Sequence, residues 1–189
     1  MSSADAPTGS PWPSVGLALV CAAALAGGLV WQARREVVAV HGATHYRAID
    51  ATLATAGRLL PEAPTALAAA GFEVVIDVRT PEEGTEDERV AVEAAGLRYL
   101  NLPVTGTPER AQFAAFSAAL AGERSHKVLV HCSSNKRAST MVMLHRVTRE
   151  GVPYAVARRD LEAVWQPRSG WERYIAGILA DPPPAPGAP

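Results

Sequence analysis

The sequence is poor in cysteine, with only Cys21 and Cys132 among its 189 residues. Cys21 lies inside an apolar run, whereas Cys132 lies between a hydrophobic strand and a polar loop, so a disulfide between them is not expected. Cys132 also has no second cysteine or paired histidine at the spacing of a zinc site. The composition therefore predicts neither a disulfide-stabilised fold nor a metal centre, and no cofactor is expected.

The sequence also lacks an excess of charge of either sign. A formal net charge of -1 gives no bulk field for gripping a nucleic acid, so a nucleic-acid partner is not expected. The hydrophobic share of 48% and the charged share of 20% are those of a folded protein. The length of 189 residues suits one well-packed domain and is too short for two of ordinary size.

Charged residues are missing altogether from one stretch, residues 15–31, which are all apolar or small. This run is near the lower limit for a helix that spans a bilayer. Arg34 and Arg35 follow it and no Lys or Arg precedes it, which favours an uncleaved anchor; a signal peptide cleaved after Ala26 is the alternative. We therefore expect residues 1–36 to be a membrane anchor or signal segment of a membrane-associated protein. The two arginines favour a cytoplasmic domain, and a cleaved signal would place it in the periplasm.

The C-terminal residues 181–189 are rich in proline. Proline can neither continue a helix nor pair in a central strand, so a disordered tail is expected there. The folded domain is then expected over residues 37–180.

Between these ends, apolar runs alternate with helical patterns. Strands are predicted at residues 72–78, 98–102 and 127–130. Helices are predicted from a Thr85 and Glu88 capping box to Gly96, from Thr107 and Pro108 onward, and at residues 138–150, 153–164 and 171–179. This order predicts an α/β domain whose parallel-type central sheet is flanked by helices, with ligands at the carboxyl ends of the strands. One N-terminal hydrophobic helix is expected to precede it.

The strand at residues 127–130 leads into a loop that begins with His131 and Cys132 and ends at Arg137, and a helix follows. Such a turn points successive backbone N–H groups inward and adds the positive end of the helix dipole, which makes a cradle for an anion. A thiol placed there ionises more readily and becomes a nucleophile, while Arg137 can hold two phosphate oxygens. The residues expected to bind phosphate are Ser133, Ser134, Asn135, Lys136, Arg137 and Ala138.

Neighbouring residues suit the same role. Asn135 tolerates the left-handed backbone that such a tight turn demands. Ser139 could donate a hydrogen bond to the cysteine sulfur and ease its departure from a phospho-enzyme intermediate, so we count it with Cys132 and Arg137 as catalytic. His131 is expected to fix the loop by hydrogen bonding. Asp77 and Arg79, at the end of a predicted strand, are expected to form an ion pair that supports it.

The order His-Cys, small residues, Arg and then Ser at the start of a helix resembles the signature loop of the cysteine-dependent phosphatases. The segments at residues 55–58, 68–79 and 99–104 extend this resemblance to the bacterial phosphatase-like domain that is joined to β-lactamase-like hydrolases, a relative of the tyrosine and dual-specificity phosphatases. The resemblance covers about residues 46–180. It implies a P-loop enzyme that hydrolyses a phosphorylated protein or a small-molecule phosphate ester through a phosphocysteine intermediate.

The sequence departs from that pattern at two points. Four residues separate Cys132 from Arg137, whereas the phosphatase signature has five. The aspartate general acid expected after the strand at residues 98–102 is also missing, and Glu109 is the nearest carboxylate that could replace it. More distant acids are Glu82, Glu83, Glu86 and Asp87. A slow enzyme is therefore expected.

Two other functions stay open at this point. The four-residue spacing is also that of rhodaneses, and residues 76–82 resemble a rhodanese segment, so a sulfurtransferase is the enzymatic alternative. The glycine-histidine segment usual in rhodaneses is missing, however. A catalytically weak phosphate-binding module is the third hypothesis, because it would explain the missing acid.

Overall fold

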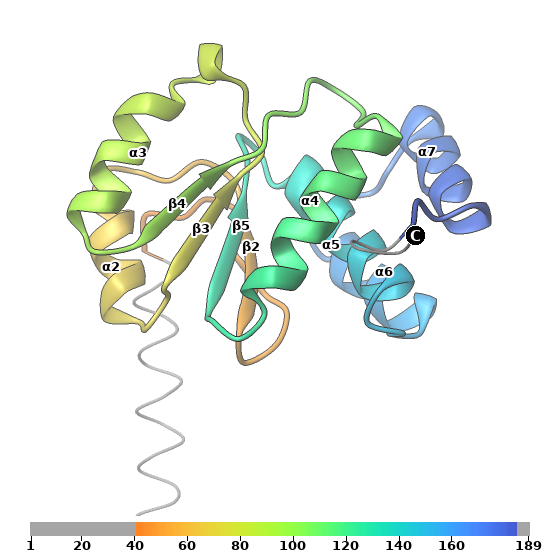
Figure 1. The fold of residues 1–189 in the computed structure, drawn as a ribbon, viewed down its shortest axis with the longest axis horizontal. Helices are drawn as coiled ribbons and strands as arrows, with labels where there is room; N and C mark the ends of the chain where they lie inside the picture. Colours follow the sequence, from red (N-terminus) through yellow and green to blue (C-terminus); the bar gives the residue numbers. More distant parts are fainter. Residues whose placement is uncertain (1–40, 185–189) are drawn as a thin grey trace, which may run out of the picture. The chain divides into compact units, whose positions relative to one another are not determined.

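Five strands form one sheet at the centre of residues 41–184, which are the part of the chain described by the computed structural model (Figure 1). Their order is β1-β2-β5-β3-β4. β5 (Val128–His131) thus lies between β2 (Leu53–Ala56) and β3 (Val74–Asp77), and β1 (Arg47–Ala48) and β4 (Arg98–Asn101) form the edges. β2, β5, β3 and β4 run parallel, whereas β1 pairs antiparallel with β2.

The sheet is therefore mixed, and the expectation of a parallel-type sheet is corrected at this edge. The connection between β1 and β2 is only residues 49–52. Parallel neighbours need a crossover of a dozen or more residues, so a connection this short allows only antiparallel pairing.

The central strands are apolar on both sides. Val128 and Val130 of β5 contribute to one core cluster, whereas Leu129 belongs to the other. In β3, Ile76 and Val75 divide in the same way. Because successive side chains of a strand point to opposite faces, these strands can be stable only with helices on both sides.

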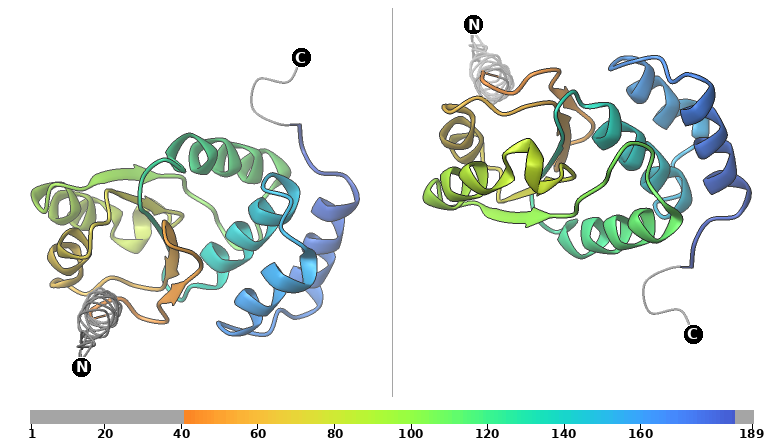
Figure 2. Two further views of the ribbon diagram at one scale, coloured as in Figure 1. Left: turned by 90° about the horizontal axis from the view of Figure 1, so that it is seen from below. Right: turned by 90° about the horizontal axis from the view of Figure 1, so that it is seen from above.

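The helices supply that cover, in two groups on opposite sides of the sheet (Figures 1 and 2). One face carries α4 (Arg110–Glu123), α5 (Lys136–Thr148), α6 (Tyr154–Glu162) and α7 (Ser169–Ala180), and the other carries α2 (Ala63–Ala69) and α3 (Thr85–Ala94). A short 3₁₀ helix, η1 (Pro81–Glu83), precedes α3. The larger core packs against the first group, where Phe113, Phe116, Leu120, Ile175 and Ile178 are buried.

The starts of two helices differ from the sequence prediction. α3 has Gly84 as its N-cap, in the left-handed conformation with φ 83°, so Thr85 is the first helical residue and forms no capping box with Glu88. The capping pair instead joins Thr80 and Glu83 around η1. α4 begins at Arg110 behind an N-cap at Glu109, later than the start predicted at Thr107 and Pro108.

The predicted membrane-associated localisation is corrected. Within residues 41–184, no helix combines the length and the apolar character that a bilayer span requires. The N-terminal hydrophobic helix predicted at residues 15–31 lies outside the described residues, as do residues 185–189 of the predicted tail.

The described part of the predicted tail contacts the folded domain. Asp181 forms an ion pair with Arg110, and the Arg149 guanidinium donates to the carbonyl oxygens of Pro183 and Pro184.

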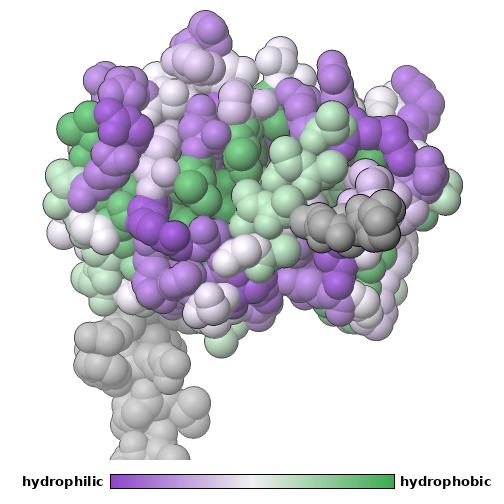
Figure 3. Space-filling view, viewed as in Figure 1, coloured by the Kyte–Doolittle hydropathy of each residue, from purple (hydrophilic) through white to green (hydrophobic). Residues whose placement is uncertain are grey.

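Hydrophobic and hydrophilic residues are interspersed on the face shown in Figure 3. Green patches lie over the edge strand β4, between the purple residues along α3 and the paler surface of the alanine-rich helix α4. The large hydrophobic side chains that are exposed among the described residues are scattered singly, at Leu60, Val90, Tyr154 and Val156. Isolated exposed hydrophobic residues of this kind are ordinary on a folded protein.

Candidate functional site

The loop between β5 and α5 lies at the carboxyl end of the central strand, where parallel sheets bind ligands. Asn135 is the N-cap of α5 and adopts φ 63° and ψ 0°, the left-handed conformation expected of it. Its buried side-chain amide donates to the carbonyl oxygen of His45 at 2.7 Å and to Thr55 Oγ1 at 3.0 Å. The residue that makes the tight turn therefore also ties the loop to β2 and to the segment before β1.

The backbone of the loop leaves its amides free. Cys132 N donates to Ala56 O at 3.2 Å, which continues the pairing of β5 with β2. Within residues 41–184, however, no acceptor is paired with the backbone N–H groups of Ser133, Ser134, Lys136, Arg137 or Ala138. Three of these are in the first turn of α5, where intrahelical acceptors are missing by geometry. Unpaired amides thus lie next to a buried cysteine, 1% exposed, and amides arranged in this way can bind an anion.

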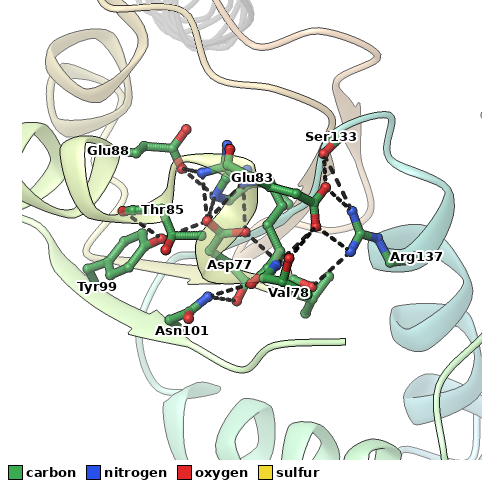
Figure 4. A network of polar contacts seen from close by, with 12 residues as sticks. Asp77, Val78, Glu83, Thr85, Glu88, Tyr99, Asn101, Ser133 and Arg137 are labelled. Carbon is green, nitrogen blue, oxygen red and sulfur yellow. Dashed lines mark hydrogen bonds and ion pairs between the residues drawn. The ribbon is translucent and has the colours of Figure 1, made fainter. Parts of the chain in front are cut away.

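Arg137 closes one side of this cradle, and its side chain is 14% exposed. Nη1 and Nη2 donate to the two carboxylate oxygens of Glu83 at 2.8 and 2.6 Å, and Nη1 also donates to Val104 O at 2.6 Å (Figure 4). The Glu83 carboxylate and then the Cys132 sulfur raise the pKa of Arg137 against the effect of burial. Nη2 also lies 3.4 Å from Ser133 Oγ, whereas among the described residues no oxygen accepts from Nε.

Glu83 is the functional neighbour that the sequence did not identify as a partner of the loop. Ser133 Oγ donates to its Oε1 at 2.5 Å, and the backbone N–H of Thr80 donates to its Oε2 at 3.0 Å. The hydrogen bonds from Arg137 hold the pKa of Glu83 at about 2, below its usual value, in spite of partial burial. Glu83 is therefore ionised near neutral pH and has no proton to donate. The spacing of Thr80 and Glu83 is that of a capping box, which could have predicted the turn around η1 from the sequence. It could not have predicted the contact between Glu83 and Arg137.

Two predicted residues have other partners in the structure. Glu109 caps α4, with its backbone N–H bonded to Gln112 Oε1 at 2.8 Å, and it does not line the cleft beside the loop. The Ser139 hydroxyl donates to the carbonyl oxygen of Asn135 instead of to the Cys132 sulfur. In this structure Ser139 is thus not bonded to the Cys132 sulfur, and Glu109 is not placed at the cleft.

The cleft itself has a volume of about 410 Å³. Its lining residues are Thr80, Glu83, Thr105, Gly106, Ser134, Lys136, Arg137 and Trp171. This volume falls in the range of small-molecule sites. Glu83 is the one acid that lines it among the described residues, and Glu83 is already occupied by Arg137.

A buried polar network lies behind the loop, on the α3 side of the sheet (Figure 4). Arg79 forms the predicted ion pair with Asp77 at 2.7 Å and a second one with Glu88 at 2.6 Å. His131 Nε2 lies 2.8 Å from Glu88 Oε1, and Tyr99 donates to Asp77 at 2.6 Å. Burial alone would raise the pKa of Asp77, but His131 and Arg79 outweigh it and lower that pKa.

The ligand atoms of Asp77, Glu88 and His131 converge closely enough to suggest a cation site. The Arg79 guanidinium already contacts both carboxylates and neutralises them. A metal ion would therefore meet a positive charge at the same place, and the donor set does not fit one. The network instead fixes the strand ends that carry the loop.

Comparison with known proteins defines the family. The family model of the phosphatase-like domain of β-lactamase hydrolase-like proteins matches residues 45–148, more than half of the 189-residue chain. The chain belongs to this family. The resemblance drawn from its loop and strand motifs is thereby confirmed. No curated protein matches the chain in sequence.

Solved structures share the phosphatase-like fold. A candidate phosphatase of the DUF442 group from Shewanella putrefaciens CN-32 has 25% identity and a TM-score of 0.66, covering 75% of this chain and 95% of that one. A candidate phosphatase from Neisseria meningitidis z2491 has 21% identity and a TM-score of 0.57, covering 69% and 96%. TpbA of P. aeruginosa, in complex with pTyr, has 18% identity and a TM-score of 0.54, covering 70% and 81%. The family and these relatives support a cysteine-based, phosphatase-type hydrolase.

Proposed function

We propose that the chain hydrolyses phosphate monoesters through a phosphocysteine intermediate on Cys132. The observation that carries this proposal is the set of unpaired amides around the buried thiol, together with the Nε group of Arg137, which has no oxygen acceptor among the described residues. Amides and a guanidinium that are fixed before the substrate arrives can stabilise charge on a transferring phosphoryl group without reorganising. The phosphate-binding residues in this proposal are Ser133 to Ala138, with their backbone N–H groups as donors.

The proposed reaction has two steps. The Cys132 thiolate attacks phosphorus, the S–P bond forms, and the P–O bond to the leaving group breaks with its electron pair on that oxygen. Water then attacks phosphorus and the S–P bond breaks, which releases inorganic phosphate and restores the thiolate. Arg137 and the loop amides hold the equatorial oxygens in both steps.

The surroundings of the cleft favour a good leaving group. Glu83 is ionised, and Glu109 caps α4 outside the cleft, so neither is placed to protonate a departing oxygen in this structure. General acid catalysis is worth roughly two to four orders of magnitude in rate. We therefore propose slow turnover and a preference for aryl over alkyl phosphates. The pTyr complex of the structurally similar TpbA makes phosphotyrosine a reasonable aryl substrate to test.

The decisive experiment compares two reactions on the full chain, with Cys132→Ser as the control. Hydrolysis of 4-nitrophenyl phosphate that is lost in Cys132→Ser supports the proposal. Sulfur transfer from thiosulfate to cyanide that is lost in the same variant, without phosphatase activity, would overturn it in favour of a sulfurtransferase.

A second measurement addresses the binding module. If both reactions are absent but inorganic phosphate still protects Cys132 from alkylation, the cradle binds an anion without turning it over, and the hydrolytic step is wrong. If phosphate gives no protection either, the anion site itself is wrong.

A further inference from the structure

A shallow hollow lies next to the cleft, where α6 connects to α7. Its lining residues are Lys136, Trp165, Gln166, Arg168 and Trp171, and its volume is about 560 Å³. Lys136 and Trp171 also line the cleft beside the cysteine loop. The two spaces are therefore adjacent, and a ligand held in the cleft can extend past these two side chains into the hollow.

The aromatic walls of the hollow are held in place by one another. The rings of Trp165 and Trp171 meet edge to face at 5.7 Å between centroids, and Trp171 meets Tyr174 in the same way at 5.9 Å. Lys136 Nζ lies 5.5 Å from the centroid of the Trp165 ring. Edge-to-face and cation–π contacts of this kind restrain side chains that would otherwise rotate.

The charges around the hollow are of one sign. Lys136 and Arg168 are exposed, and neither forms an ion pair with any residue between 41 and 184. None of the residues that line the hollow is acidic. Glu172, the acid next to Trp171, is already paired with Arg158 at 2.7 Å. Two unpaired cations beside apolar rings attract an anionic group, and the neighbouring acid is neutralised.

We propose that this hollow is a subsite for a second anionic group of the substrate, a carboxylate or a phosphate, located beyond the phosphate that is cleaved. The inference rests on the proposed function, because it takes the cleaved phosphate to lie on the Cys132 loop. Arg168 is its main specificity residue, and Lys136 joins the two sites. The preferred substrate class is a phosphate monoester with a further negative charge next to its aromatic or apolar body.

The test uses two matched pairs of substrates with the full chain. One pair is carboxyphenyl phosphate and its neutral carbamoyl analogue, and the other is a phosphotyrosine peptide with Glu or Gln beside the phosphotyrosine. The ratio of kcat/KM for the acidic over the neutral member is expected to be about fivefold at low ionic strength and to fall as salt is added. Which of the two pairs shows the larger ratio distinguishes a small molecule from a peptide as the source of the anion.

Two arginine variants separate the subsite from general charge effects. Arg168→Gln should bring the ratio to about one. Arg173→Gln removes the same charge from an exposed position on α7 that lines neither space, and should leave the ratio unchanged. A ratio of one in the unmodified chain, or an equal loss in both variants, overturns the subsite while leaving the phosphatase proposal intact.

Binding to Cys132→Ser keeps the test independent of turnover. If the unmodified chain hydrolyses none of the four compounds, the proposed function fails, and calorimetric affinities for the same pairs then decide the subsite. Tighter binding of the acidic members that is lost in the Arg168→Gln background supports it. Equal or undetectable binding overturns it.

Discussion

In the proposed site, Arg137 shares its N–H donors between the protein and the phosphate. Its Nη1 and Nη2 groups donate to Glu83 and to the carbonyl oxygen of Val104, which fixes the guanidinium while Nε has no protein oxygen as a partner among the described residues. A guanidinium can serve two partners in this way because it has five N–H donors in a rigid plane, whereas an ammonium acts as a point charge.

Arg137→Lys should therefore lower kcat/KM for 4-nitrophenyl phosphate by at least about 100-fold, because lysine keeps the charge and loses the planar set of N–H donors. Steady-state kinetics checks this, with Arg173→Gln as the control for a changed arginine elsewhere. A lysine variant that retains a tenth or more of the activity would show that charge alone suffices at this position.

The ion pair of Glu83 with Arg137 makes the stability of the protein depend on pH. Its pKa is about 2 in the folded protein and 4.5 in an unconstrained chain, so the pair stabilises the fold fully above about pH 4.5 and loses this contribution as the pH falls toward 2. The fall in the free energy of unfolding between pH 5 and pH 3 should be about 1–2 kcal/mol smaller in Glu83→Gln than in the original chain, as denaturant unfolding can measure. The same loss in both proteins would assign the acid sensitivity to other carboxylates.

At the scale of elements, the end of β2 and the cysteine loop touch through a glycine. A Cβ atom at Gly57 would lie 2.5 Å from Thr44 Oγ1 and 3.3 Å from Ser134 Cα. Arg58 N also donates to Ser133 O at 3.2 Å, so the strand end and the loop are directly bonded at this point. A side chain at this position would therefore force Thr44 or the loop to shift.

Gly57→Ala should destabilise the protein by about 1–2 kcal/mol and weaken the protection of Cys132 by phosphate, because the loop must shift to admit the methyl group. Thermal unfolding and alkylation rates measure the two effects. Gly122→Ala, in the open surface of α4, is the matched control and should be neutral or slightly stabilising. Unaltered phosphate protection in Gly57→Ala would mean that the strand end does not position the loop.

The elements also show what sequence patterns can and cannot predict. β3, β4 and β5 lie within a few residues of their predicted positions, because apolar, β-branched runs mark buried strands. β1 and β2 were not identified, since they have two and four residues and β2 reads Leu-Ala-Thr-Ala. α2 is short and starts beside a proline, so its signal was equally weak.

At the scale of the whole molecule, a ligand that binds only the folded state must stabilise all of it. Inorganic phosphate at ten times its dissociation constant should raise the free energy of unfolding by about 1.4 kcal/mol. For a domain of this size this corresponds to a rise of roughly 3–6 °C in Tm, which differential scanning fluorimetry can measure. Sulfate should act in the same direction, and Arg137→Lys should reduce both shifts. An equal shift in the lysine variant would place the anion elsewhere.

The contact between Glu83 and Arg137 illustrates why the assembled site exceeds what the sequence predicted. The two residues are 54 positions apart and come from η1 and α5, so their pairing exists only after β3 and β5 are neighbours. Cys132, Arg137 and the loop amides could be proposed as one site from the sequence because they are contiguous in it. The acid that orients the arginine, and the tryptophans that line the hollow, depend on long-range packing that no local pattern encodes.

The place of β5 in the sheet has a consequence for how the chain folds. β2 and β3 do not pair with each other. Each pairs with β5, which lies more than fifty residues further along the chain. During synthesis their facing edges stay open until that strand leaves the ribosome, and such non-local parallel pairings close slowly. The strand that leads into Cys132 therefore completes the sheet, and chains released before this strand is made would present two unpaired edges to chaperones or to one another.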